Sequence, residues 1–178
     1  MDLQPTLQGE SVLLRPIRPE DHDALLAVAA DPELWAQHPA RDRYREAEFR
    51  TYFECWLMRG GGLIICERST RRPIGASCYS FEGRRPGEVE IGWTFLARDH
   101  WGGATNREVK RLMIRHALSS VERVVFRVAA TNMRSRRALE KIGARLTDRT
   151  EEIEVAGSPT LHVVYEIGRD APIAGATG

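Results

Sequence analysis

The sequence predicts one α/β domain built on a mixed, mostly antiparallel β-sheet, and three observations lead to this fold class. First, 178 residues are enough for one continuous core, and no repeat or linker divides residues 8–168. Second, the apolar pattern changes between strand-like alternation and helical spacing, in the order strand, helices, three strands, helix, strand, helix, two strands. Third, hairpins flank one strand–helix–strand crossover, which makes one strand pair parallel. We expect the domain to span residues 1–168 and a loose tail to follow at 169–178.

The composition is that of a globular protein, with 42% hydrophobic and 29% charged residues. No apolar run approaches the roughly 20 residues that cross a bilayer, and the opening residues, MDLQP, do not read as a secretory signal. We therefore expect a cytoplasmic protein with no membrane partner. The formal net charge of +1 makes a nucleic-acid partner unexpected, whereas the sequence leaves a homodimer open.

Three cysteines, Cys55, Cys66 and Cys78, lie far apart in apolar stretches. They lack the spacing of metal ligands. Because free cysteine is usually a core residue, we expect buried thiols and no metal site.

The first third of the chain combines one strand with helices. Residues 11–17 predict a strand, and the acidic residues after Pro19 predict a helix start. Asp31 followed by Pro32 predicts a second short helical segment, because Asp caps a helix and Pro fits its first turn. A longer helix is expected over residues 45–58, where aromatic side chains recur at helical spacing. They are Phe49, Tyr52, Phe53 and Trp56.

Three strands are expected next, over residues 63–68, 74–81 and 88–96. The triple glycine at 60–62 precedes a strand and not a helix, so we interpret it as a turn. The third strand alternates, which predicts two different faces. One face carries Val89, Ile91, Trp93 and Phe95, and the other carries Glu88, Glu90, Gly92 and Thr94.

The last part of the chain predicts helices at 105–119 and 132–142, with a short apolar strand at 124–130 between them. Asn132 suits the cap of the second helix, and Gly143 suits its end. Two further strands are expected, near residues 146–155 and 161–167.

A glycine-bearing loop leads into the helix at 105–119 and is the strongest local signal in the chain. Backbone N–H groups at a helix start lack acceptors within the helix, and with the helix dipole they favour an anion such as phosphate. Gly102 and Gly103 allow close approach to the backbone. Basic residues in the first two helical turns add positive charge: Arg107, Lys110 and Arg111. An ordinary helix start would give a similar pattern, so the loop alone does not decide the function.

Together with the segment that follows the next strand, this loop resembles the GCN5-related N-acetyltransferase (GNAT) superfamily, in the branch of ribosomal-protein alanine acetyltransferases and their relatives. The resemblance covers nearly the whole domain. It rests on four segments in order: LLRPIRPED at 13–21, EIGW at 90–93, WGG at 101–103 and NMRSRRALEKIG at 132–143. It implies six or seven strands whose central parallel pair splays apart, flanked by helices. It also implies acetyl-CoA as cosubstrate and direct acetyl transfer to an amine.

The resemblance places the pantetheine arm of acetyl-CoA beside the strand at 93–96 and the pyrophosphate at the loop that follows. The implied cofactor-binding residues are Trp93, Thr94, Phe95, Leu96, Trp101, Gly102, Gly103, Ala104, Thr105, Asn106, Arg107, Asn132, Arg134 and Ser135. The chain departs from the common loop pattern, Gln/Arg-x-x-Gly-x-Gly/Ala, at Trp101, Ala104 and Asn106. Candidates for the adenosine 3′-phosphate are Arg134, Arg136 and Arg137; a solvated helix face is the alternative.

Acetyl transfer to an amine needs a base, a donor to the thioester oxygen and a proton or hydrogen bond for the leaving thiolate. Glu90 is the first candidate base and Glu88 the second, the alternative for both being an exposed strand carboxylate. A backbone N–H of the splayed strand is the candidate donor to the oxygen. Many superfamily members have a tyrosine where this chain has Leu139, so Ser135 becomes the candidate partner of the thiolate. A serine in the first turn of a helix often bonds the backbone instead.

The histidines have plainer interpretations than catalysis, apart from His100 beside the loop. His116 lies on the apolar helix face and is expected in the core. The remaining three, in polar or late-strand settings, are His22, His38 and His162.

Residues 20–58 and 151–162 are expected to form the acceptor pocket. Three acidic side chains there would suit a cationic acceptor, or would only mark an exposed strand edge: Glu151, Glu152 and Glu154. A protein N-terminus and a small-molecule amine both remain open as the acceptor. The alternative to an enzyme is a non-catalytic acyl-CoA-binding regulatory domain of the same fold, and a third class is an arginine-based nucleic-acid binder, which the net charge disfavours.

Overall fold

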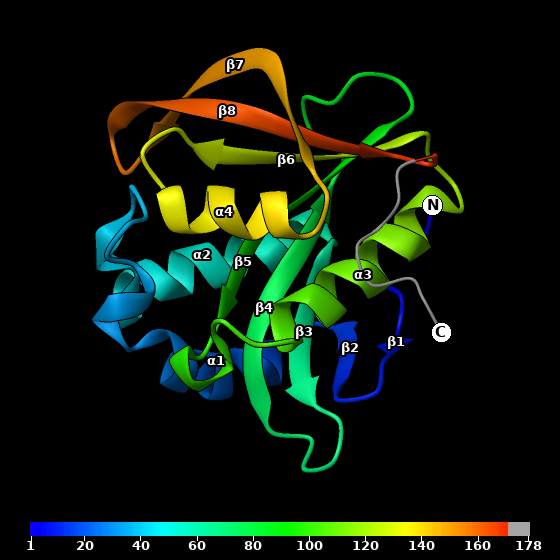
Figure 1. Cartoon of the computed structure of the whole chain (residues 1–178). Helices are drawn as coiled ribbons and strands as arrows, with labels where there is room; N and C mark the ends of the chain where they lie inside the picture. Colours follow the sequence, from blue (N-terminus) through cyan, green and yellow to red (C-terminus); the bar gives the residue numbers. More distant parts are fainter. Residues whose placement is uncertain (171–178) are drawn as a thin grey trace.

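Eight strands form one sheet in the order β1-β2-β3-β4-β5-β6-β8-β7 in the computed structural model, which describes residues 1–170 (Figure 1). Among these residues β5 and β6 are the one parallel pair, as the crossover predicts. The strands are β1 (Leu7–Gln8), β2 (Val12–Pro16), β3 (Gly62–Glu67), β4 (Pro73–Ser80), β5 (Glu88–Leu96), β6 (Arg123–Ala129), β7 (Arg145–Val155) and β8 (Ser158–Gly168). The α-helices are α1 (His22–Ala29), α2 (Glu46–Arg59), α3 (Thr105–Leu118) and α4 (Met133–Lys141).

Helices cover both faces of the sheet (Figure 1). On one face, Met113 of α3 and Leu139 of α4 join Ile91 and Phe126 of the sheet in one apolar cluster. On the other face, α1 and α2 pack in a second cluster that contains the four predicted aromatic residues of α2, Phe49, Tyr52, Phe53 and Trp56. Burying side chains of this size contributes about 1.5–3 kcal/mol each. The sheet therefore separates two cores, and α3 and α4 lie on the same side.

The ends of α4 follow the predicted local signals. The side chain of Asn132 accepts a hydrogen bond from the Ser135 N–H at 3.1 Å, which satisfies a donor that the helix leaves free. At the other end Gly143 has a φ of 88°, a left-handed conformation that costs glycine little. These two residues fix where α4 starts and stops beside β6.

The predicted alternation of β5 is confirmed for its first half and wrong for its second. Val89 and Ile91 pack with α3 and α4, but Trp93 and Phe95 pack on the opposite side, with α1 and α2. The cause is a bulge: Trp93 has a φ of 50°, and the register with β4 shifts between Ala76 and Cys78. An extra residue reverses the faces of all that follow.

β5 and β6 part soon after they begin to pair. Their register runs from Glu88 opposite Arg123 to Glu90 opposite Val125, and no later residues of the two strands pair within the described chain. Beyond that point β6 remains paired with β8, as far as Ala129 opposite His162. A wedge-shaped gap therefore opens in the middle of the sheet.

Two boundaries differ from the sequence-based expectation. The sheet has eight strands rather than six or seven, because β1 adds a two-residue strand too short to carry an alternating pattern. The hairpin of β7 and β8 is longer than predicted, since polar and glycine-containing residues at its tip still pair, as far as Val155 opposite Ser158. Of the expected tail, residues 171–178 lie outside the described residues. No helix within residues 1–170 combines the length and the apolarity that crossing a membrane requires.

An ion pair between half-buried Arg15 and buried Asp21 ties the end of β2 to the start of α1. The carboxylate of Asp21 accepts from both guanidinium nitrogens of Arg15, at 2.8 and 2.6 Å, and from the Arg18 N–H at 2.8 Å. Burial would raise the pKa of the Asp21 carboxyl, but the bonds from Arg15 and Arg18 outweigh it and hold this pKa below its usual value. The charged form of Asp21 is therefore stabilised by folding.

We predict that Asp21→Asn lowers the free energy of unfolding by about 1.5–3 kcal/mol at neutral pH, the usual contribution of hydrogen bonds to a charged group. Because the folded-state pKa is depressed, the contribution is present above the unfolded-state pKa of about 3.9 and is lost as the pH falls through the folded value. Urea unfolding of both proteins at neutral pH and at successively lower pH measures this. A difference that stays constant down to strongly acidic pH would contradict it.

Candidate active site

The gap between β5 and β6 contains a cavity of about 180 Å³. Its walls come from the unpaired parts of the two strands, from α3 and α4, and from the segment before α2. This cavity continues into a cleft of about 570 Å³ at the start of α3, since eight residues line both: Trp35, His38, Thr94, Asn106, Asn132, Ser135, Ala138 and Ile142. The cavity and the cleft therefore adjoin, and together they form one channel.

The loop before α3 forms one wall of the cleft. The indole N–H of Trp101 donates to the carbonyl of Leu96 at 2.8 Å, which ties the loop to the end of β5. Gly102 has a φ of 70°, and a Cβ added to Gly102 or Gly103 would meet open space. Within residues 1–170, the backbone N–H groups from 102 to 107 make no hydrogen bond. These free donors at a helix N-terminus form the predicted anion site.

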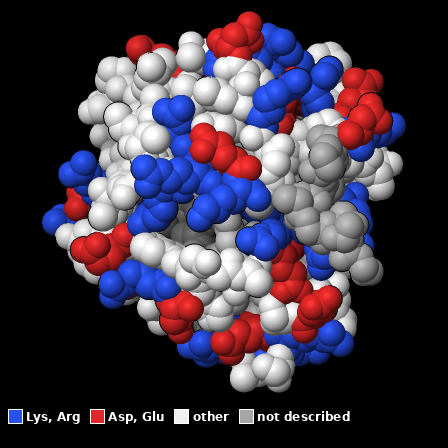
Figure 2. All heavy atoms as spheres, viewed as in Figure 1, with Lys and Arg blue, Asp and Glu red and all other residues white. Residues whose placement is uncertain are grey.

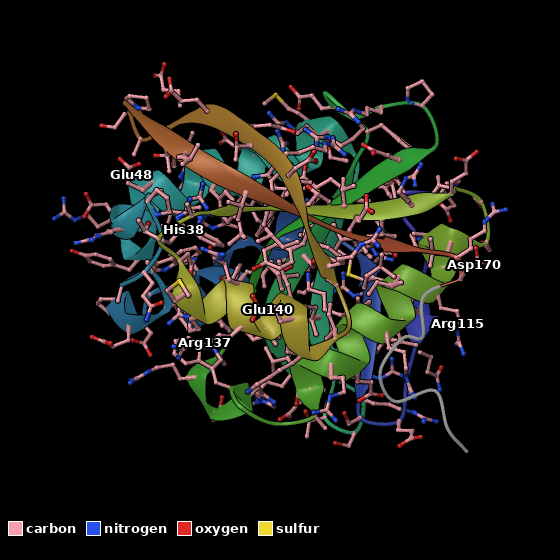
Figure 3. All side chains as sticks on the ribbon, turned by 45° about the horizontal axis from the view of Figure 1, so that its top comes forward. His38, Glu48, Arg115, Arg137, Glu140 and Asp170 are labelled. Carbon is pink, nitrogen blue, oxygen red and sulfur yellow. The ribbon has the colours of Figure 1, made fainter. Side chains whose placement is uncertain are left out.

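Basic side chains surround the same cleft. Figure 2 shows Lys and Arg gathered beside a hollow between α4 and the loop before α3. The basic residues that line the cleft are Arg107, Arg134, Arg137 and Lys141. Figure 3 places Arg137 on α4. Positive charge is thus concentrated where phosphate groups would meet the free N–H groups.

Arg134 spans the cleft instead of pointing into solvent. Its guanidinium lies 4.2 Å from the centroid of the Trp101 ring and donates to the carbonyls of Glu33 and Leu34 at 3.3 and 2.7 Å. Arg136, a third candidate for the 3′-phosphate, faces elsewhere: it donates to Tyr165 Oη and to the carbonyl of Ala130. Arg137 is the exposed arginine of the three.

Glu90 is buried and ion-paired, not an exposed strand carboxylate. Only 3% of its surface is accessible, and its Oε2 lies 2.6 Å from Nη2 of Arg127. Arg127 and Arg84 also reach Glu151, each at 3.3 Å. Glu90 does not itself line the cavity, whereas its partner Arg127 does. The second candidate base, Glu88, is likewise buried, and Arg149 holds it at 2.8 Å.

Ser135 lies at the junction of the cavity and the cleft, where the first turn of α4 places it. Its N–H is used by the Asn132 cap, and no hydrogen bond of its hydroxyl is found within the described residues. Leu139, one turn further on, is 7% exposed and belongs to the apolar cluster. Ser135 therefore has a hydroxyl available to a ligand, and Leu139 does not.

Two histidines that the sequence did not single out line the cavity. Figure 3 shows His38 in the segment that precedes α2. Burial and the charge of Arg43 lower the pKa of His38 to about 3, so its ring is neutral at neutral pH. His162 of β8 bonds the carbonyl of Thr160 through Nδ1 at 2.9 Å. Since a carbonyl only accepts, Nδ1 carries a proton, and in the neutral ring Nε2 is then the acceptor.

Several other residues that the sequence suggested as candidates lie outside the channel. His100 turns toward Glu67 at 3.5 Å and Thr105 at 3.4 Å, on the far side of the loop. His116 is half-buried and bonds the carbonyl of Asp2, so the expectation of a core histidine is wrong. Within residues 1–170 the three cysteines are free, and no group of three or more His, Cys, Asp or Glu could hold a metal ion.

The structure brings most of the implied cofactor-binding residues into the channel, with Ala104 and Thr105 lying outside its lining. Those that line the cavity or the cleft are Trp93, Thr94, Phe95, Leu96, Trp101, Gly102, Gly103, Asn106, Arg107, Asn132, Arg134 and Ser135. Lys110, expected near the phosphate groups, instead lines the cavity inside the sheet.

The chain matches the family model described as "Acetyltransferase (GNAT) domain" over residues 11–145. No curated protein matches it. Among solved structures, a putative acetyltransferase from T. thermophilus is 28% identical, with 92% of this chain and 88% of that chain covered and a TM-score of 0.70.

Two further solved structures share the fold at lower identity. A probable acetyltransferase (GNAT family) from Chromobacterium violaceum has a TM-score of 0.81 at 20% identity, covering 92% of this chain and 85% of that chain. RimJ from Mycobacterium smegmatis, solved in complex with CoA-disulfide, has a TM-score of 0.70 at 17% identity, covering 93% of this chain and 86% of that chain.

We predict that Arg127→Met lowers the free energy of unfolding by about 3 kcal/mol, because it leaves the buried Glu90 carboxylate without its nearest partner. The double variant Glu90→Gln/Arg127→Met should recover most of this loss. Arg145→Met is the control: its pair with Glu166 leaves Arg145 81% exposed, so removing it should cost less than about 1 kcal/mol. Equal losses in the two single variants, measured by urea unfolding, would contradict a structural role for the Glu90–Arg127 pair.

Proposed function

The chain belongs to the GNAT acetyltransferase family, and from that premise we propose that it transfers the acetyl group of acetyl-CoA directly to a primary amine. The observation that carries the proposal is that the cleft beside the free N–H groups of the loop before α3 adjoins the cavity between β5 and β6. A phosphate-bearing molecule with a long, narrow arm fits this combination of anion site and channel.

The residues of the channel suit acetyl-CoA in three respects. The free N–H groups at 102–107 and the nearby Arg107 and Arg137 suit the phosphates. The unpaired edge of β5 beyond Glu90 offers backbone groups to the amides of the pantetheine arm. The cavity between β5 and β6 would take the thioester end. Acetyl-CoA would supply the acetyl group as an activated thioester.

The acceptor amine would approach from the face that carries α1 and α2. On that side the cavity is lined by Tyr52, His38 and Trp93, together with Arg127 and His162. Tyr52 also donates to the carbonyl of Trp93 at 2.9 Å and so holds the bulge of β5 against α2. These side chains would fix the position of the amine beside the gap.

A protonated amine must lose a proton before it can attack. Glu90 is the proposed base, acting through water, since its carboxylate lies behind Arg127 at the acceptor side of the gap. His162 is the second candidate, because it lines the cavity and its Nε2 is an acceptor. Backbone N–H groups of β5 beyond Gly92 would donate to the thioester oxygen, and Ser135 would donate to the leaving sulfur.

The proposed acceptor class is a protein N-terminus or a small primary amine in the cytoplasm. The nearest alternative, a regulatory domain that binds acyl-CoA without turnover, shares the donor site but needs no base.

An acceptor screen tests the proposed activity. Peptides with varied first residues, polyamines and aminoglycosides are incubated with acetyl-CoA, and released CoA is measured. We predict release of CoA with at least one class of acceptor. Of the two variants Glu90→Gln and His162→Gln, the one that removes the base should lower kcat by about 100-fold or more. CoA binding without release for any acceptor would favour the regulatory alternative.

The phosphate site has its own test. We predict that Arg137→Ala weakens CoA binding about tenfold and leaves the affinity for dephospho-CoA nearly unchanged, because one charged contact to the 3′-phosphate is lost. Arg115→Ala is the matched control, since Arg115 is also an exposed arginine, on α3 and away from the cleft (Figure 3). Titration calorimetry measures both ligands. An equal loss of affinity for CoA and for dephospho-CoA in Arg137→Ala would place Arg137 at another part of the ligand.

A further inference from the structure

Lys110 is a lysine buried in the middle of the sheet. It lies in the second turn of α3, and only 5% of its surface is accessible. Asn106, one turn earlier, lines the same cavity, so the inward face of α3 presents two polar side chains to the gap between β5 and β6. A lysine in such a position is rarely buried without a partner.

The ammonium group of Lys110 has no carboxylate partner within the described residues. Its Nζ donates to Thr94 Oγ1 at 2.6 Å and lies 5.6 Å from the centroid of the Phe126 ring. Thr94 Oγ1 in turn lies 2.7 Å from Ser77 Oγ, which reaches the carbonyl of Gly92 at 3.4 Å. This chain of hydroxyl groups uses one of the three N–H bonds of Lys110. The other two have no acceptor among residues 1–170, on a group that faces the cavity.

The surroundings of Lys110 make its positive charge costly unless a ligand offers a negative charge or hydrogen-bond acceptors to the ammonium group. Burial lowers the pKa of the ammonium to about 7, and the carboxylate of Glu90 opposes that shift. The other ionisable side chains that line the cavity come from β6, β8, α2 and the segment before α2; they are Arg127, His162, Tyr52 and His38. None of these side chains is an anion. A negatively charged ligand could therefore supply the charge that would balance the Lys110 ammonium in the cavity.

Opposite Lys110, α4 contributes apolar Leu139 and the hydroxyl of Ser135 to the cavity. The sulfur of CoA would lie in this cavity when its phosphates occupy the cleft, which makes the following inference depend on the proposed function. Sulfur gains a full negative charge when the bond to the acetyl carbon breaks. That charge would form beside a buried cation with two free N–H bonds.

We propose that Lys110 is a catalytic residue that donates a hydrogen bond, and then a proton, to the leaving sulfur of CoA. As the amine nitrogen bonds to the acetyl carbon, the carbon–sulfur bond breaks and its electron pair goes to sulfur. A proton passes from Nζ to the sulfur, leaving a neutral amine on Lys110, and the amine recovers a proton from water. The proton released by the acceptor nitrogen goes to the general base. Ser135 then serves as a second hydrogen-bond donor to the same sulfur.

The direct test is the ionisation of the CoA thiol while it is bound, and it needs no acceptor. Wild-type protein saturated with CoA is titrated, and the thiolate is followed by its ultraviolet absorbance. We expect the pKa of the bound thiol to be at least about one unit below that of free CoA, because a buried cation favours the thiolate. In Lys110→Met this depression should be lost, whereas Lys110→Arg should retain part of it.

Arg115→Met is the matched control, because Arg115 is an exposed cation on the same helix as Lys110 and lies away from the cavity and the cleft. It should keep the depressed thiol pKa when CoA is saturating. Lys110→Gln is measured as well, and thermal unfolding identifies which variants are folded. Once an acceptor is known, kcat should fall about 100-fold in Lys110→Met.

The same thiol pKa in wild type and in a folded neutral variant of Lys110 would overturn this inference and leave the proposed function standing. Failure of the wild-type protein to bind CoA would overturn both. A depression of the thiol pKa that is present in wild type and Arg115→Met and absent from Lys110→Met and Lys110→Gln would support it.

Discussion

β5 and β6 share hydrogen bonds only from Glu88 to Glu90 on one strand and from Arg123 to Val125 on the other, and their divergence beyond these residues governs the rest of the molecule. The bulge at Trp93 turns β5 toward α2, where Tyr52 holds it, while β6 stays with β8. Backbone groups that a closed sheet would satisfy are left facing a gap. Because unpaired backbone groups are costly when buried, such a gap is stable only if it is solvated or filled by a ligand with matching polar groups.

Charge is distributed around this gap according to the two faces of the sheet. On the side of α1 and α2, the carboxylates of Glu90 and Glu151 pair with the guanidinium groups of Arg127 and Arg84. On the side of α3, Lys110 has a hydroxyl for a partner and no carboxylate among residues 1–170. Farther out, the cleft at the start of α3 is rimmed by basic residues and free N–H groups. The carboxylates beside the acceptor side of the gap are thus paired with arginines, whereas basic residues without a carboxylate partner in the described chain lie where phosphates and a leaving thiolate would need them.

Features that depend on neighbouring residues were predictable, and those that depend on packing were not. Alternation, caps and glycines predicted the element order, the ends of α4 and the loop at Gly102. The bulge at Trp93 was not predictable, because nothing in an alternating sequence marks where an extra residue will be inserted. The alternating pattern of the strand allows Glu90 to be exposed. Only the fold shows that Arg127, 37 residues away in the chain, lies beside it. The sequence suggests a surface charge for Lys110 in the second turn of α3, although Lys110 stands three and four residues before the buried Met113 and Ile114, the spacing of one helix face.

The proposed function depends most directly on CoA binding by the loop before α3 together with the open edge of β5. Hydrogen–deuterium exchange of the backbone, with and without saturating CoA, measures this at the N–H groups concerned. We predict slower exchange in CoA at residues 102–107, whose N–H groups lack acceptors within the described chain, and at residues 91–96 of β5. The outer strands β1 and β2 should change little. Unchanged exchange in both segments at saturating CoA, or protection confined to another part of the sheet, would contradict CoA binding at this site.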